Sequence, residues 1–225
     1  MIPYKDENPT ETTPYVTIGL IALNVGIFIW ELFSPLGMEA IVRDFGAVPK
    51  NLITLSGAQP ISPVGTLFTS MFLHAGFFHV GGNMLYLWIF GNNIEDRLGH
   101  LRFIVFYLLA GVFAAYGHSI TAPDSKIPMV GASGAVSSVL GAYLLLFPRA
   151  RIYTIIFFGF FYQIVKVPAL IVIGFWAIIQ VVSGLLSSGK FGDGGVAWFA
   201  HIVGFVFGLL GVKIFMLGKR QRYGS

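Results

Sequence analysis

Cysteine is absent from this sequence, and charged residues are scarce. Without cysteine the chain can form no disulfide, bind no metal through thiolates and use no cysteine nucleophile. Charged residues make up 11% of the chain and hydrophobic residues 56%, whereas a soluble domain carries roughly a quarter charged residues. This composition excludes a water-soluble globular protein and predicts a protein that crosses a membrane several times.

A targeting sequence is also lacking. The first 15 residues have no apolar core and no small-residue cleavage site, so they are neither a signal peptide nor an arginine-rich transit peptide. We expect residues 1–14 to form a short cytoplasmic N-terminal tail, residues 15–217 a membrane domain, and residues 218–225 a basic cytoplasmic C-terminal tail.

Basic residues outnumber acidic ones, 14 to 10. Ten of the 14 fall in segments on the same side of the membrane as the two termini, which is the asymmetry that sets membrane orientation. The excess of cations therefore needs no nucleic-acid partner. We predict a multi-pass protein of the prokaryotic inner membrane with both termini in the cytoplasm.

Six apolar segments have about the length that crosses a hydrocarbon core of ~30 Å. They are residues 15–33, 78–94, 101–120, 131–147, 167–186 and 196–217. Residues 34–75 are too long for a simple connection and should form short pieces in the membrane interface, and residues 152–164 an interfacial hairpin or short helix. The expected fold class is an all-α integral membrane protein, a six-helix bundle with a long interfacial first loop.

Four polar residues fall in the outer halves of three predicted helices. His79 and Asn83 lie on the second, Ser133 on the fourth and His201 on the sixth. With a rise of 1.5 Å per residue, the four lie within about 10 Å of one depth. Polar groups in membrane helices face the bundle interior or a wet cavity. We expect them to share one hydrated site.

The chemistry of these residue types suggests acyl transfer. Serine is also a common helix N-cap, and small residues in membrane helices commonly serve packing, so the segment around Ser133 does not by itself require catalysis. A serine nucleophile needs a base, usually histidine. We assign Ser133 as nucleophile and His201 as general base and then acid. The backbone N–H of Ser133 and the side chains of His79 and Asn83 are candidate oxyanion donors.

A carboxylate that could orient His201 is missing. After Glu31, the only acidic residues in the predicted helices are Glu95 and Asp96, at the cytoplasmic end of the second. The sequence therefore predicts a Ser/His dyad rather than a triad, unless Asp193 in an outer loop reaches back.

Small residues recur on the two helices that would carry this dyad. They occupy positions 133, 137 and 141 on the fourth helix and positions 204, 208 and 211 on the sixth. Such spacing lets helix backbones approach closely.

Four motifs, in order along the chain, resemble those of the rhomboid family of intramembrane serine proteases. Residues 131–134 are similar to its Gly-x-Ser-Gly motif and residues 200–204 to its Ala-His-x-x-Gly motif. Residues 74–83 resemble its His-x4-His-x3-Asn pattern, and residues 95–99 its Glu-x-Arg-x-Gly signature. One departure is Ser137, where some members have a tyrosine that stacks on the catalytic histidine. The orientation of His201 must therefore come from elsewhere.

The resemblance implies cleavage of single-span transmembrane protein substrates in the lipid bilayer, near the outer membrane face, with no cofactor and no metal. It gives supporting roles to His74, Gly131, Gly134 and Gly204. It also implies that loop 187–195 caps the site and that substrate enters beside the fifth helix.

Other functions remain to be weighed against a protease. The main alternative is a non-catalytic rhomboid-like protein that binds membrane clients, which loss of Ser133 or His201 would have favoured. A transporter would show paired broken helices or internal repeats, and neither is found. A zinc or aspartyl intramembrane protease is excluded, because the sequence has no His-Glu-x-x-His motif and no pair of intramembrane aspartates.

Overall fold

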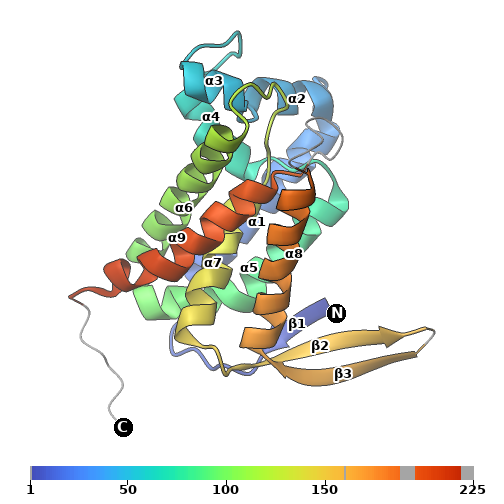
Figure 1. The fold of residues 1–225 in the computed structure, drawn as a ribbon, viewed down its shortest axis with the longest axis vertical. Helices are drawn as coiled ribbons and strands as arrows, with labels where there is room; N and C mark the ends of the chain where they lie inside the picture. The colour runs from blue at the N-terminus through green and yellow to red at the C-terminus, as the bar shows by residue number, and fades with distance from the viewer. Residues whose placement is uncertain (1, 160, 188–195, 219–225) are drawn as a thin grey trace.

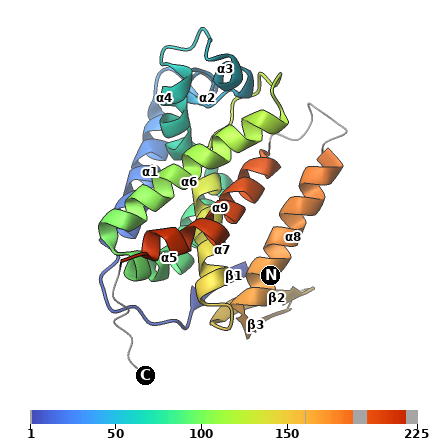
Figure 2. The same ribbon diagram turned by 60° about the vertical axis from the view of Figure 1, so that its left-hand side comes forward.

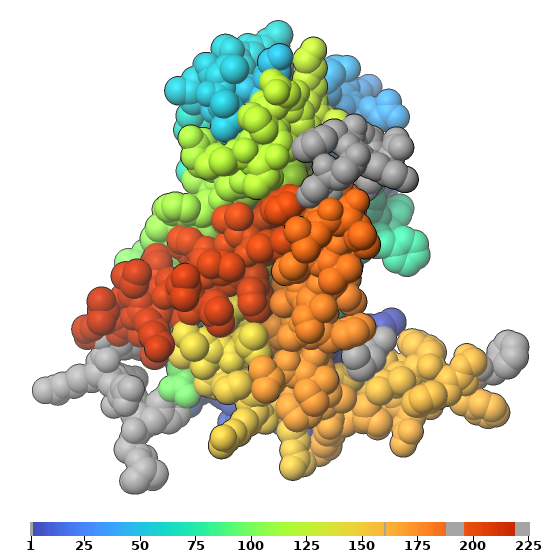
Figure 3. Space-filling view, viewed as in Figure 1, coloured from blue at the N-terminus to red at the C-terminus, as the bar shows by residue number. Residues whose placement is uncertain are grey.

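Six long helices surround and include one buried central helix in the computed structural model, which describes residues 2–159, 161–187 and 196–218 (Figure 1). They are α1 (Tyr15–Phe33), α5 (Phe77–Leu98), α6 (His100–Thr121), α7 (Ser133–Leu146), α8 (Ala169–Ser187) and α9 (Trp198–Met216). The central helix is α7, which packs against α5, α6, α8 and α9 (Figure 2). In the space-filling view α8 and α9 cover most of it (Figure 3). Every residue of α7 from Gly134 to Tyr143 is buried.

Four of these helices, α1, α6, α8 and α9, are long and apolar enough to cross a membrane. The central helix α7 is apolar but has only 14 residues, which span about 21 Å. The 22-residue helix α5 is long enough, but His79, Asn83 and two further asparagines make it less apolar. The mostly helical membrane fold is thus as predicted, and the number of six spanning helices stays a prediction.

The segment between α1 and α5 folds into short helices at one end of the bundle (Figure 1). They are α2 (Met38–Phe45), α3 (Pro49–Thr54), α4 (Pro63–Thr69) and the 3-10 turn η1 (Ser70–Phe72). Gln59 holds the first two together by donating its side-chain N–H to the backbone carbonyls of Arg43 and Gly46, at 2.8 and 2.9 Å. Their location in the membrane interface stays a prediction.

A three-stranded antiparallel sheet lies at the opposite end of the bundle (Figure 1), so the expectation of an all-α fold is wrong in this respect. The strands are β1 (Ile2–Asp6), β2 (Arg151–Phe158) and β3 (Phe161–Pro168), in that order. The hairpin predicted for residues 152–164 is therefore a β-hairpin, and no helix forms there.

The N-terminus is not a free tail, because β1 forms the edge of this sheet. Ile2 pairs with Ile155 and Asp6 with Ile152. Asp6 also accepts a hydrogen bond of 2.8 Å from the hydroxyl of Tyr143, near the end of α7. Burial raises the pKa of Asp6. Local sequence patterns do not reveal a strand whose partner lies about 150 residues away.

Glu95 holds the start of α1 against the end of α5. Its carboxylate accepts hydrogen bonds from the backbone N–H groups of Val16 and Thr17, at 2.9 and 2.7 Å, and from the Thr17 hydroxyl at 2.7 Å. It also lies 2.6 Å from Nδ1 of His100. The first N–H groups of a helix have no partner within the helix, so the fully buried Glu95 serves as a cap supplied by another helix.

Replacing Glu95 with alanine should destabilise the fold by about 2 kcal/mol or more, because it leaves several buried donors without an acceptor. Thermal unfolding followed by tryptophan fluorescence in detergent would measure the loss. Glu39→Ala is the matched control, since Glu39 is an exposed residue of α2. Equal melting temperatures for the two variants would contradict the capping role.

Candidate active site

Ser133 and His201 lie in hydrogen-bonding contact although they are 68 positions apart in the sequence. The Ser133 Oγ is 2.8 Å from Nε2 of His201. Ser133 is the first residue of α7, and His201 lies in the first turn of α9. The structure thus brings together the two residues that the sequence selected as a pair.

The loop before α7 places Ser133 inside the bundle. It runs inward from the end of α6 (Figure 1) and is held by the N–H of Gly131, which donates to the carbonyl of Ser70 at 2.8 Å. Gly131 has φ +121°, a value that residues with a side chain rarely adopt. Because the helix begins here, the N–H of Ser133 is one of the donors with no partner inside α7.

The backbones of α7 and α9 touch directly, which sets the distance between Ser133 and His201. A Cβ atom on Gly204 would overlap the carbonyl of Gly134, and one on Gly208 would overlap the carbonyl of Ser138. Gly141 of α7 lies in the same way against the backbone of α9 at Phe205. The two helices can approach this closely only because these residues lack a side chain.

Two of the small residues predicted for this contact are not part of it. A Cβ on Gly211 would meet only the ring of Phe207, at 3.8 Å or more. Ser137 turns back on its own helix and donates to the carbonyl of Ser133 at 2.6 Å. The contact face of α7 is shifted by one residue from the predicted one, because it follows Gly134 and Ser138.

His79 packs against the loop that leads to Ser133. A Cβ on Gly131 would lie 2.6 Å from both Nε2 and Cε1 of His79. The Nδ1 of His79 accepts a hydrogen bond of 3.4 Å from the N–H of Ala75. In a neutral imidazole the other nitrogen then carries the proton, so Nε2 of His79 is a donor next to the start of α7.

Asn83 lies one turn further along α5 and is 7% exposed. Within the described residues its Nδ2 has no hydrogen-bond partner. A buried amide donor without a partner is costly in a folded protein, and such a group fits a site whose acceptor belongs to a ligand.

His74 supports His79 from below. Its ring is fully buried and meets the His79 ring edge to face, with centroids 5.1 Å apart. Its backbone N–H donates to the Glu31 carboxylate, at 3.2 Å from the nearer oxygen. Burial, and to a lesser extent the charge of His79, lower the pKa of His74 to about 4. The ring is therefore neutral at pH 7 and holds that of His79 in place.

A residue that the sequence did not single out completes the surroundings of His201. Oε1 of Gln180 in α8 lies 2.7 Å from Nδ1 of His201. The rings of Trp176 and Trp198 lie 6.3 and 6.1 Å from the imidazole. A signal was present, since Gln180 is the only amide side chain in an otherwise apolar helix, and such residues are usually functional.

A small cavity adjoins Ser133. Its volume is about 30 Å³, and its walls include Ser70, Met71, Gly131 and Ala200. This is enough room for one water molecule. The predicted capping loop at residues 188–195, with Asp193, and the basic cluster at residues 219–222 lie outside the described residues.

A helical membrane protein with a serine and a histidine in contact between two buried helices is the class that this fold and site define. The family model called Rhomboid domain matches residues 63–217. The chain belongs to the rhomboid family.

Three relatives illustrate the similarity. The chain is 32% identical over 146 residues to the presenilin-associated rhomboid-like protein, mitochondrial, of Bos taurus, a match that covers 64% of this chain and 36% of the relative. Rhomboid protein 1, mitochondrial, of Saccharomyces cerevisiae is 32% identical over 61% of this chain and 38% of its own length. RHOMBOID-like protein 1 of Arabidopsis thaliana is 34% identical over 72% and 36%. The chain thus spans little more than a third of their length.

Gly208→Ala should push α7 and α9 apart, because the new methyl group would overlap the Ser138 carbonyl. We expect a loss of about 1–3 kcal/mol of stability, the usual cost of overpacking. Thermal unfolding in detergent would measure it. Gly211→Ala adds the same methyl group to the same helix where space is open, and it should stay within about 1 kcal/mol of wild type. An equal effect of both changes would show that the contact is not tight.

Proposed function

We propose that this chain is an intramembrane serine endopeptidase that acts through a dyad of Ser133 and His201. The observation that carries the proposal is the 2.8 Å contact between the Ser133 hydroxyl and Nε2 of His201. Serine becomes a good nucleophile only beside a base that can take its proton. Membership of the rhomboid family, whose members are generally intramembrane serine proteases, adds support.

In the proposed reaction, Oγ of Ser133 attacks the carbonyl carbon of the scissile peptide bond while its proton passes to Nε2 of His201. The carbonyl oxygen becomes an oxyanion, which the Ser133 N–H, Nε2–H of His79 and the Asn83 amide stabilise. His201 then gives its proton to the leaving amine, and the acyl group remains on Ser133.

Water completes the cycle. His201 takes a proton from a water molecule, whose oxygen attacks the acyl carbon, and Ser133 leaves with that proton as the second product is released. The cavity of about 30 Å³ next to Ser133 is where this water would lie. Hydrolysis in a bilayer needs such a place, since lipid excludes water from the surroundings.

The proposed substrates are single-span transmembrane proteins, cut near the outer membrane face. An extended segment exposes its peptide bonds, so the substrate helix must unwind at this level. We further propose that both termini lie in the cytoplasm of a prokaryotic cell. Two of the relatives are named as mitochondrial proteins, so the membrane in which the chain resides stays a prediction.

The competing proposal is a non-catalytic rhomboid-like protein that binds membrane clients. Such a protein has no need of a serine hydroxyl in contact with an imidazole. Both groups are present here and touch, which favours the protease.

Ser133→Ala and His201→Ala should each abolish cleavage of a single-span substrate in liposomes, because the first removes the nucleophile and the second the base. A fluorophosphonate probe should label the wild type and not Ser133→Ala. Both variants should keep the wild-type melting transition. Equal cleavage by wild type and Ser133→Ala, or no labelling of the folded wild type, would overturn the protease proposal and leave the binding protein.

Asn83→Ala should lower kcat by up to about 10²–10³-fold, the effect of losing one oxyanion donor. His79 and the Ser133 N–H remain as donors, so we expect residual activity. Initial rates of substrate cleavage would measure the loss. Asn92→Ala changes the same residue type at the far end of α5 and should cleave at the wild-type rate. Equal rates for the two variants would remove Asn83 from the oxyanion site.

A further inference from the structure

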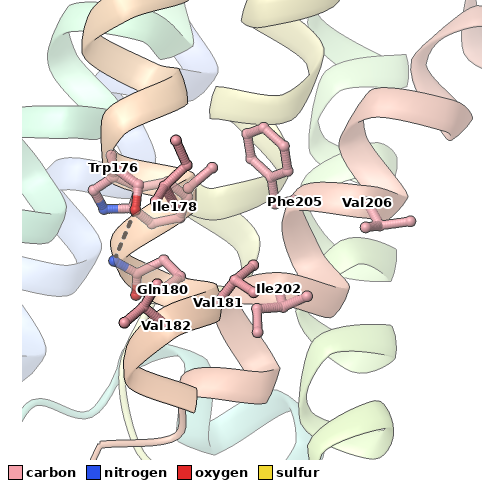
Figure 4. A pocket seen from close by; sticks show the side chains of 9 residues that line it. Trp176, Ile178, Gln180, Val181, Val182, Ile202, Phe205 and Val206 are labelled. Atoms are coloured by element: carbon pink, nitrogen blue, oxygen red, sulfur yellow. Dashed lines mark hydrogen bonds between the residues drawn. The ribbon is translucent and has the colours of Figure 1, made fainter. Parts of the chain in front are cut away.

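Gln180 joins the site from α8, a helix that carries neither Ser133 nor His201. The side chain is 6% exposed, and its Oε1 lies 2.7 Å from Nδ1 of His201. Its Nε2 donates to the backbone carbonyl of Trp176, one turn earlier in the same helix, at 3.3 Å (Figure 4). Gln180 is thus held at both ends of its amide group.

This pair of hydrogen bonds fixes which end of the amide faces His201. An amide NH₂ only donates and an amide oxygen only accepts. The carbonyl of Trp176 can only accept, so it must face the NH₂ group, and Oε1 is left to face the imidazole. Nδ1 of His201 must then carry a proton in order to donate to Oε1.

The proton on Nδ1 determines what the other ring nitrogen can do. A neutral imidazole has one protonated and one unprotonated nitrogen. With Nδ1 protonated, the lone pair of Nε2 points at the Ser133 hydroxyl, 2.8 Å away. This is the tautomer that can accept the serine proton. The opposite tautomer would present an N–H to Ser133 and could not act as a base.

The environment protects this contact from competition by water. Behind Gln180 lies a groove of about 370 Å³ between α8 and α9, whose walls are almost entirely apolar and include Val181, Ile202 and Phe205 (Figure 4). Hydrogen bonds in such low-dielectric surroundings are stronger than in water. The rings of Trp176 and Trp198 further limit how far the imidazole can tilt.

We propose that Gln180 is the positioning residue of His201, setting its tautomer and ring orientation and thereby replacing the stacking tyrosine that Ser137 lacks. The catalytic part of this inference rests on the proposed function. Because Gln180 is neutral, it orients the imidazole without adding a counter-charge for the imidazolium, unlike the aspartate of a catalytic triad.

Gln180→Met tests the inference, because methionine has a similar length but no amide oxygen. Gln180→Glu keeps an acceptor oxygen at the same position and should rescue much of the loss. Gln163→Met is the matched control, since Gln163 is an exposed residue of β3. Melting temperatures near that of wild type would show that each variant is folded.

The direct readout is the ¹⁵N NMR spectrum of protein labelled at histidine, with the His201 signals assigned by their loss in His201→Asn. In wild type and Gln163→Met, Nδ1 of His201 should appear protonated and Nε2 unprotonated. In Gln180→Met the spectrum should move towards the opposite tautomer, because the acceptor that selects the first one is gone.

The kinetic readout is cleavage of a transmembrane substrate. Gln180→Met should lower kcat by about 10²-fold, the cost of a misplaced catalytic group, with little change in KM, because Gln180 holds the base and does not touch the substrate. Unchanged His201 signals or a wild-type kcat in Gln180→Met would overturn the inference. The proposed function fails separately, if folded wild type neither cleaves nor labels, and the NMR result still decides whether Gln180 sets the tautomer.

Discussion

The direct contact between the α7 and α9 backbones is the constraint on which the site depends. Ser133 and His201 have side chains too short to meet across an ordinary helix pair. They meet because Gly204 lies on the carbonyl of Gly134 and Gly208 on that of Ser138. In a lipid surrounding there is no hydrophobic drive between helices, so close packing of this kind supplies much of the association. The packing of the bundle and the geometry of the proposed dyad therefore have the same cause.

A second constraint is that each buried polar group must find a partner. Glu95 takes the N–H groups that begin α1, and Tyr143 donates to Asp6 across the bundle and the sheet. Gln180 accepts from His201 in the same sense. In each case the partners come from elements remote in sequence, so these bonds fix how the elements pack. Asn83 is the exception, with a buried donor that is unpaired among the described residues.

The sequence predicted the positions of the long helices to within a few residues, since apolar segments of membrane length are a strong and local signal. It did not predict the sheet. The strand β1 has a partner about 150 residues away, and its five residues show no alternation of their own. The contact face of α7 was predicted one residue out of register, because positions 134 and 138 are as small as positions 133 and 137.

The sequence by itself determined that the chain is a membrane protein and which serine and histidine to pair, because residue types and motif spacing are properties of the chain alone. Only the tertiary structure decided how His201 is held. Gln180 lies on a helix that no motif connects to the other two, and an amide in an apolar helix can face lipid, a neighbouring helix or a site. Its role depends on the rotation of α8 against α9, which packing of whole helix faces determines.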